Sequence, residues 1–127
     1  MRIARARDAS KLMLTRYPRV YDAARRPYSA GRFWLRRPHD AEYGVFALFT
    51  GREGVFLDVG ANAGMSALTF RIYNRRSPIV SIEANPFHEP DLRFVSRLAQ
   101  PFTYHIVGAD SEPRTTSLYV PHYGACR

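Results

Sequence analysis

The junction between a short apolar run and a glycine-containing loop constrains the fold of this chain more than any other part of the sequence. The run covers residues 55–59, and the loop Gly60–Gly64 follows it with the sequence GANAG. The run has the length of a buried strand, and the two glycines predict a tight turn that opens a helix. Free N–H groups at such a helix N-terminus attract anions. Asp58 lies near the end of the run, so the strand would bring it close to this helix N-terminus. The pattern therefore predicts a nucleotide-type cofactor site.

The rest of the chain alternates predicted strands with predicted helices. Strands are expected over residues 55–59, 79–84, 102–107 and 115–120, and helices over 3–16, 41–49, 63–73 and 90–98. Asp40 is expected to cap the helix 41–49. Residues 19–38 are expected to be irregular, because prolines and a glycine interrupt them. The order β-α-β-α-β with a trailing strand predicts an α/β fold with a Rossmann-like, parallel, doubly wound sheet, preceded by a helical N-terminal segment.

Acidic residues occur at or just past the ends of three successive predicted strands. They are Asp58, Glu83 and Asp110. Ligands of parallel sheets bind at the carboxyl ends of the strands, and an acid about 20 positions after the first glycine binds ribose hydroxyls in dinucleotide folds. Glu83 follows Gly60 by 23 positions. A carboxylate accepts both hydrogens of a vicinal diol, so Glu83 is the expected ribose ligand.

Two cofactor classes fit a loop of this kind. The dinucleotide fingerprint is G-x-G-x-x-G, with a pyrophosphate at the helix N-terminus. Here Asn62 stands between Gly60 and Gly64, and Asp58 precedes the first glycine by two positions. An acid there suits an ammonium group better than a pyrophosphate. S-adenosylmethionine has an ammonium group, a carboxylate and a ribose, so the sequence favours it over NAD.

Several of these motifs together resemble a known family. The sequence FLDVGANAG at residues 56–64, followed by IEANP at 82–86, resembles the FkbM-type methyltransferases of the class I S-adenosylmethionine-dependent superfamily. VGAD at 107–110 and SLYVP at 117–121 resemble the third strand and the following hairpin of that family, so the similarity spans about residues 40–121. The resemblance implies O-methylation of a hydroxyl on a sugar, a glycolipid or a polyketide-type secondary metabolite.

The resemblance also assigns roles to residues of this chain. It implies that the segment from Asp58 to Gly64 holds the methionine part of the cofactor, that Glu83 binds the ribose, and that Asp110 lies near the adenine. The full set of expected cofactor contacts is Asp58, Gly60, Ala61, Asn62, Gly64, Glu83, Ala84 and Asp110.

The family's next diagnostic strand, of the Lys-Ile-Asp-Val-Glu-Gly type, is not found before Arg127. We therefore expect the N-terminal half of the family fold, a truncated methyltransferase with its first strand as an exposed edge. A second copy or a completing partner chain is expected at that edge. The alternative is an inactive fragment, or a non-catalytic binding module that needs a partner chain or binds an anionic partner.

No catalytic residue can be named from the sequence. His88, His105 and His122 are the candidate bases by side chain, and each is expected to be structural or exposed. Cys126 has no activating neighbour in sequence, so it is not expected to act as a nucleophile. No metal-binding pattern is present in the sequence.

Charge divides the chain into a basic N-terminal arm, residues 1–40, and a partial cofactor-binding domain, residues 41–127. The arm holds 11 of the 19 basic and 3 of the 11 acidic residues, which accounts for the whole net charge of +8. Such an arm can bind an anionic surface, but no RNA-binding signature accompanies it, so nucleic acid is not the expected partner. No apolar run approaches the ~20 residues of a membrane span. A single cysteine and no membrane span favour a cytoplasmic location.

Overall fold

The structure is a computed structural model, and it describes residues 18–119. The predicted helix 3–16, His122 and Cys126 lie outside the described residues.

Three parallel strands form the sheet, in the order β1-β2-β3. They are β1 (Phe56–Val59), β2 (Ile79–Glu83) and β3 (Phe102–Ile106), and the helices α3 (Met65–Tyr73) and α4 (Glu89–Leu98) connect them. The register pairs Leu57 with Val80, and Val80 with Thr103. This arrangement confirms the predicted α/β fold with a parallel sheet and the β-α-β-α-β order of its elements.

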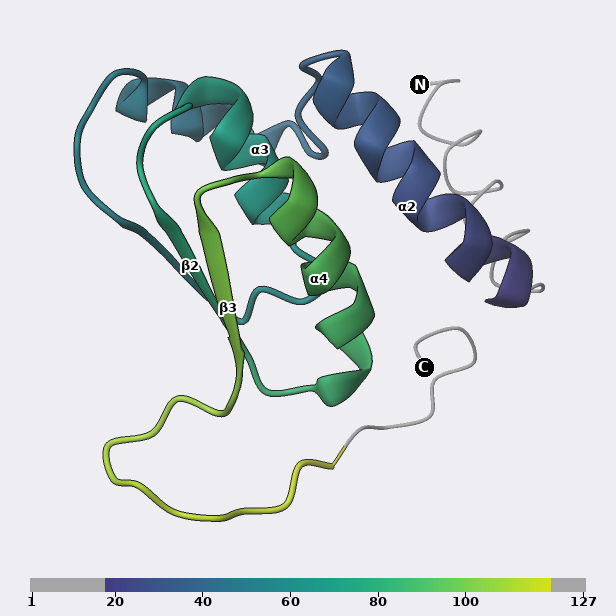
Figure 1. Cartoon of the computed structure of the whole chain (residues 1–127), viewed down its shortest axis with the longest axis vertical. Helices are drawn as coiled ribbons and strands as arrows, with labels where there is room; N and C mark the ends of the chain where they lie inside the picture. The colour runs from purple at the N-terminus through teal and green to yellow at the C-terminus, as the bar shows by residue number, and fades with distance from the viewer. Residues whose placement is uncertain (1–17, 120–127) are drawn as a thin grey trace.

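The helices cover one face of this sheet (Figure 1). Right-handed crossovers between strands that are added in one direction place both connecting helices on the same side. Side chains alternate accordingly, so Ile79 and Phe102 face the helices and are buried. They pack with residues from both helices, and the buried cluster is Ala61, Ala67, Leu68, Phe70, Ile79, Leu92, Val95, Ala99 and Phe102.

The opposite face of the sheet is uncovered over the described residues. Leu57 and Val59 of β1 are 57% and 59% exposed, although both are aliphatic. Beside them, in register across the sheet, lie Ile82 and the exposed His105. β1 also forms one edge of the described sheet, as the sequence predicted for the first strand.

The prediction that residues 19–38 are irregular is wrong. They contain α2 (Pro18–Trp34), a helix that continues through Pro27. Tertiary contacts stabilise it, since Arg25 and Arg26 both donate to the buried carboxylate of Asp91 on α4, the latter over 2.9 Å. Ser29 is also buried and donates to Met65 Sδ of α3 over 3.2 Å. These contacts outweigh the local cost of a proline within a helix.

The helix predicted over 41–49 is a 3₁₀ helix, η1 (Glu42–Phe49). Asp40 does not reach into its first turn, because its Oδ1 accepts the N–H of the adjacent Ala41 over 2.7 Å. Phe46 is the residue that fixes η1 to the core. Its ring contacts those of Phe56 and Phe70 at centroid distances of 5.2 and 5.6 Å.

The trailing strand predicted over 115–120 is not found. Residues 107–119 have no strand, and Val120 lies outside the described residues. The segment leaves the carboxyl end of β3 and swings away below the sheet (Figure 1). A strand needs a neighbouring strand for its backbone groups, and this path offers it none among the described residues.

His39, between α2 and η1, gives the fold a dependence on pH. Thr69 donates its hydroxyl hydrogen to Met65 O, so its Oγ1 accepts from the His39 backbone N–H and from Nδ1, both at 3.3 Å. Nε2 is buried without a partner among the described residues. Burial, with the nearby charge of Arg32, lowers the pKa of His39 from 6.5 to about 4.

We expect the free energy of unfolding to fall as the pH drops from 6.5 toward 4. In that window the unfolded chain binds a proton at His39 that the folded chain does not, whereas above pH 6.5 the contribution is fully present. His39→Gln should flatten this slope, measured by urea unfolding at a series of pH values. A variant that keeps the full wild-type slope would assign the pH dependence to other groups.

Candidate functional site

The loop after β1 is a tight turn held by the neighbouring strand. Gly60 N and Ala61 N both donate to the carbonyl oxygen of Ile82 in β2, over 2.8 and 3.1 Å. Gly64 N then donates to Ala61 O over 2.8 Å and closes the turn at the start of α3. Gly60, Asn62 and Gly64 have φ angles of 79°, 50° and 80°. Left-handed φ angles explain two glycines and an asparagine at these positions.

The two glycines have different neighbours. A Cβ atom on Gly64 would lie 2.9 Å from Val95 Cγ2 and 3.2 Å from Leu92 Cδ2, so Gly64 lets α3 and α4 approach closely. A Cβ atom on Gly60 would meet no atom within 4 Å. Gly64 therefore serves the packing of the helices, whereas Gly60 borders open space at the carboxyl end of β1.

Glu83, the last residue of β2, joins the loops that follow the first two strands. Its Oε2 accepts the N–H of Asn62 and its Oε1 accepts the N–H of Asn85, each over 2.7 Å. The residue is buried. A carboxylate offers about four lone-pair sites, so each Glu83 oxygen retains capacity for one more donor.

Asp58 points to the helix-covered side of β1. Its Oδ2 accepts from the hydroxyls of Ser66, over 2.6 Å, and Ser81, over 3.4 Å. Burial raises the pKa of Asp58, the charge of Glu83 adds to this effect, and the two serine bonds oppose it. The sequence interpretation missed both serines. Ser66 could have been found, because it lies in the first turn of the helix that the glycine loop opens.

The remaining predicted contacts lie in two different places. Ala84 is exposed and directly follows Glu83, at the same end of the sheet. Asp110 is exposed beyond the end of β3, and its described contacts are local, with Ser111 and with Arg114 over 2.5 Å. The structure therefore brings together the residues from Asp58 to Gly64 with Glu83 and Ala84, but shows no contact between Asp110 and this group.

The candidate bases are spread over the described part of the chain. His88 ends the 3₁₀ helix η2 (Pro86–His88), which follows β2, and lies five positions after Glu83 in sequence. His105 lies on β3 and is exposed on the uncovered face of the sheet. Between residues 18 and 119, no cluster of three or more His, Cys, Asp or Glu side chains could hold a metal ion. No helix in the same range is long and apolar enough to cross a membrane.

Two described cavities lie away from this loop. One, of about 460 Å³, is bordered by Gly54 and Pro78, which precede β1 and β2. The other, of about 260 Å³, lies between α2 and α4, with Arg26 and Arg97 among its lining residues. Neither contains a predicted cofactor residue. The backbone at the carboxyl end of the sheet is nevertheless fixed by hydrogen bonds, through Ile82 O and Glu83.

Comparison with models of known families, with curated proteins and with solved structures gave no match to this chain. The fold itself defines a class, a small α/β protein with a three-stranded parallel sheet and a glycine-containing turn after its first strand. The family resemblance drawn from the motifs stays a prediction.

Replacing each glycine with alanine should distinguish Gly64, which lies between packed helices, from Gly60, which borders open space. Gly64→Ala should lower the free energy of unfolding by about 2–4 kcal/mol, since it combines an unfavourable φ with overpacking against Val95. Gly60→Ala should cost only about 1–2 kcal/mol, for the φ angle alone. Urea unfolding of both variants measures the difference. Equal losses would contradict the close approach of α3 and α4 at Gly64.

Proposed function

We propose that this chain binds S-adenosylmethionine at the carboxyl ends of β1 and β2, as a methyltransferase of the FkbM type. The observation that carries the proposal is the buried carboxylate of Glu83. It is bonded to the glycine-containing turn through Asn62 N and retains capacity for further donors. The vicinal hydroxyls of a ribose are donors of the matching kind.

The surroundings of Glu83 suit the other parts of the same cofactor. The N–H groups in the first turn of α3 lack partners within the helix and suit the methionine carboxylate. Asp58 lies at the same end of the sheet, and its raised pKa reflects a half-buried carboxyl group that no cation of residues 18–119 offsets. An ammonium group near Asp58 would favour the ionised form. Gly60, which borders open space, leaves room for the ligand.

NAD is the competing cofactor, and Asp58 favours S-adenosylmethionine over it. A pyrophosphate at the start of α3 would lie near the carboxyl group of Asp58, which accepts a hydrogen bond from Ser66 in the first turn of that helix. An acid near a doubly charged anion is unfavourable. S-adenosylmethionine brings a singly charged carboxylate to the start of the helix and an ammonium group to Asp58.

The proposed reaction is transfer of the methyl group to a hydroxyl of a sugar, glycolipid or secondary metabolite. S-adenosylmethionine supplies an activated methyl group, and the protein's task is to hold the acceptor oxygen in line with it, near a base. The described residues identify no such base. Pairing of β1 with a second copy or a completing partner chain stays a prediction.

The alternative, a non-catalytic module that binds an anionic partner through the basic arm, loses part of its support. Arg25 and Arg26 on α2 are engaged with Asp91 of α4 and hold the helix in place. One carboxylate therefore compensates one of these two positive charges within the fold.

Isothermal titration of the folded chain tests the proposal. S-adenosylmethionine and its demethylated product should both bind, and NAD should bind more weakly. Glu83→Gln should weaken binding of S-adenosylmethionine by about tenfold or more, because an amide NH₂ replaces one acceptor oxygen.

Glu112→Gln is the matched control, since Glu112 is exposed and lies outside the proposed site. It should bind like the wild type. No binding by a folded wild-type chain would refute the cofactor assignment. Unchanged affinity in Glu83→Gln would refute the role of Glu83 alone.

A further inference from the structure

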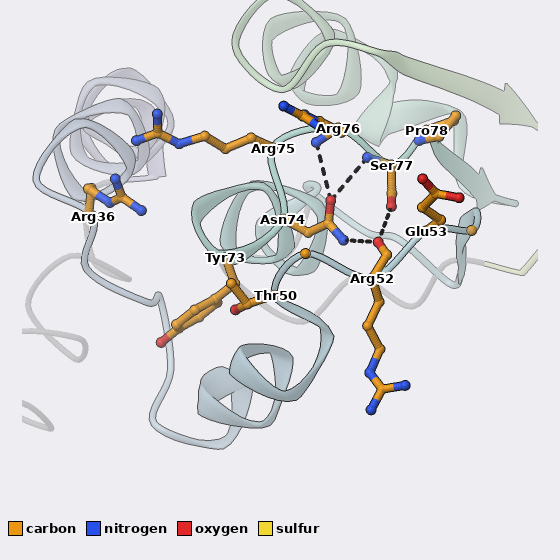
Figure 2. Close-up of a pocket in the computed structure, with 12 residues that line it drawn as sticks. Arg36, Thr50, Arg52, Glu53, Tyr73, Asn74, Arg75, Arg76, Ser77 and Pro78 are labelled. Carbon is orange, nitrogen blue, oxygen red and sulfur yellow. Dashed lines mark hydrogen bonds between the residues drawn. The ribbon is translucent and has the colours of Figure 1, made fainter.

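The cavity of about 460 Å³ lies at the amino ends of β1 and β2, whereas Glu83 is at the carboxyl end of β2. Figure 2 shows the residues that line the cavity. Two loops form most of it, residues 50–54 before β1 and residues 74–78 before β2, and Arg36 and Tyr73 add to its wall. A strand of four or five residues separates the two ends by roughly 15 Å. A ligand here would therefore occupy a site separate from the proposed cofactor site.

The wall of the cavity is fixed by hydrogen bonds between the two loops. The buried side chain of Asn74 donates through Nδ2 to Phe49 O and to Arg52 O, both over 2.9 Å. Its Oδ1 accepts from the backbone N–H groups of Arg76 and Ser77 over 3.2 and 3.0 Å. Figure 2 shows the bonds of Asn74 with Arg52, Arg76 and Ser77. The backbone that carries the arginines of this cavity is thus preformed.

Arg71 also holds the loop of residues 74–78 in place. Its guanidinium is buried and donates to the carbonyl oxygens of Asn74, Ser77, Ala99 and Pro101, over 2.8–3.0 Å. Arg71 is therefore a structural arginine. Two of the cavity arginines each have one backbone partner, since Arg36 Nη2 donates to Ile72 O over 3.0 Å and Arg52 Nε to Leu48 O over 3.2 Å, and their other N–H groups remain for a ligand.

The cavity is strongly basic. Arg36, Arg52, Arg75 and Arg76 line it, against the single acid Glu53, which leaves a charge of +3. Within residues 18–119, none of these four arginines forms a salt bridge.

The cavity between α2 and α4 provides an internal comparison. It also has arginines in its lining, but Arg26 is paired with Asp91 and Arg93 with Glu89. Its lining carries a charge of +2, but two of its three arginines are paired with a carboxylate, whereas none of the four arginines in the cavity at the amino ends of the strands is paired among the described residues.

We propose that the arginine-lined cavity binds a phosphate-bearing ligand with two or more negative charges. Guanidinium groups donate bidentately to phosphate oxygens. In Figure 2 the labelled arginine side chains do not meet at one point, and Arg52 extends away from Arg75 and Arg76. Separated donors of this kind suit a ligand with more than one charged group better than a single small anion. The volume exceeds that of an inorganic anion and lies in the range of small-molecule sites. The ligand is either a soluble diphosphate or the headgroup of an anionic lipid.

Titration of the full chain with inorganic pyrophosphate, and sedimentation with vesicles that contain phosphatidic acid, a phosphomonoester that can carry two charges, against phosphatidylcholine vesicles, test the proposal. The double variant Arg75→Gln/Arg76→Gln should weaken binding at least about tenfold. The control Arg93→Gln/Arg97→Gln removes the same charge from the other cavity and should bind like the wild type. Glu53→Gln should strengthen binding, because it removes the one carboxylate of the lining.

Binding of pyrophosphate that depends on Arg75 and Arg76 supports a soluble ligand, and the same dependence with phosphatidic acid vesicles alone supports a lipid headgroup. Three results would overturn the proposal: no binding of either probe, equal losses in the two double variants, or binding of an RNA oligonucleotide only. Circular dichroism and urea unfolding establish that each variant is folded.

Discussion

The carboxyl end of the sheet depends on the two hydrogen bonds that the buried carboxylate of Glu83 accepts. It stands at the end of the central strand and accepts backbone N–H groups from the loops after both β1 and β2. The turn from Gly60 to Gly64 is thereby tied to β2, and Gly64 in turn lets α3 lie directly against Val95 of α4. A single acidic side chain thus links the sheet, the turn and the contact between two helices.

The two ends of this small sheet differ in their chemistry. The carboxyl end presents Asp58 and Glu83 around a turn with positive φ angles, whereas the amino end presents four arginines without carboxylate partners among the described residues. Both ends rest on backbone that hydrogen bonds hold in place, through Glu83 at one and through Asn74 at the other. The chain therefore offers two preformed surfaces of opposite charge, one at each end of the same strands.

The sequence predicted the β-α-β-α-β order because each element there has a local signal, an apolar run or a helical periodicity bounded by glycine or proline. α2 was missed, because its stability comes from Asp91 and Met65, which lie far from it in sequence. The trailing strand was predicted from composition, which does not show whether a neighbouring strand is present. The arginine-lined cavity was missed for a related reason, since its residues meet only when the loops before β1 and β2 come together.

The central claim is that the turn after β1 is the cofactor site, and an NMR titration of the ¹⁵N-labelled chain with S-adenosylmethionine tests it most directly. The amide signals of Gly60, Asn62 and Gly64 should shift in a saturable way. Those of Gly51 and Gly54, at the other end of the sheet, should stay in place. Signals at the turn that do not move at saturating cofactor, or shifts confined to Gly51 and Gly54, would contradict the claim.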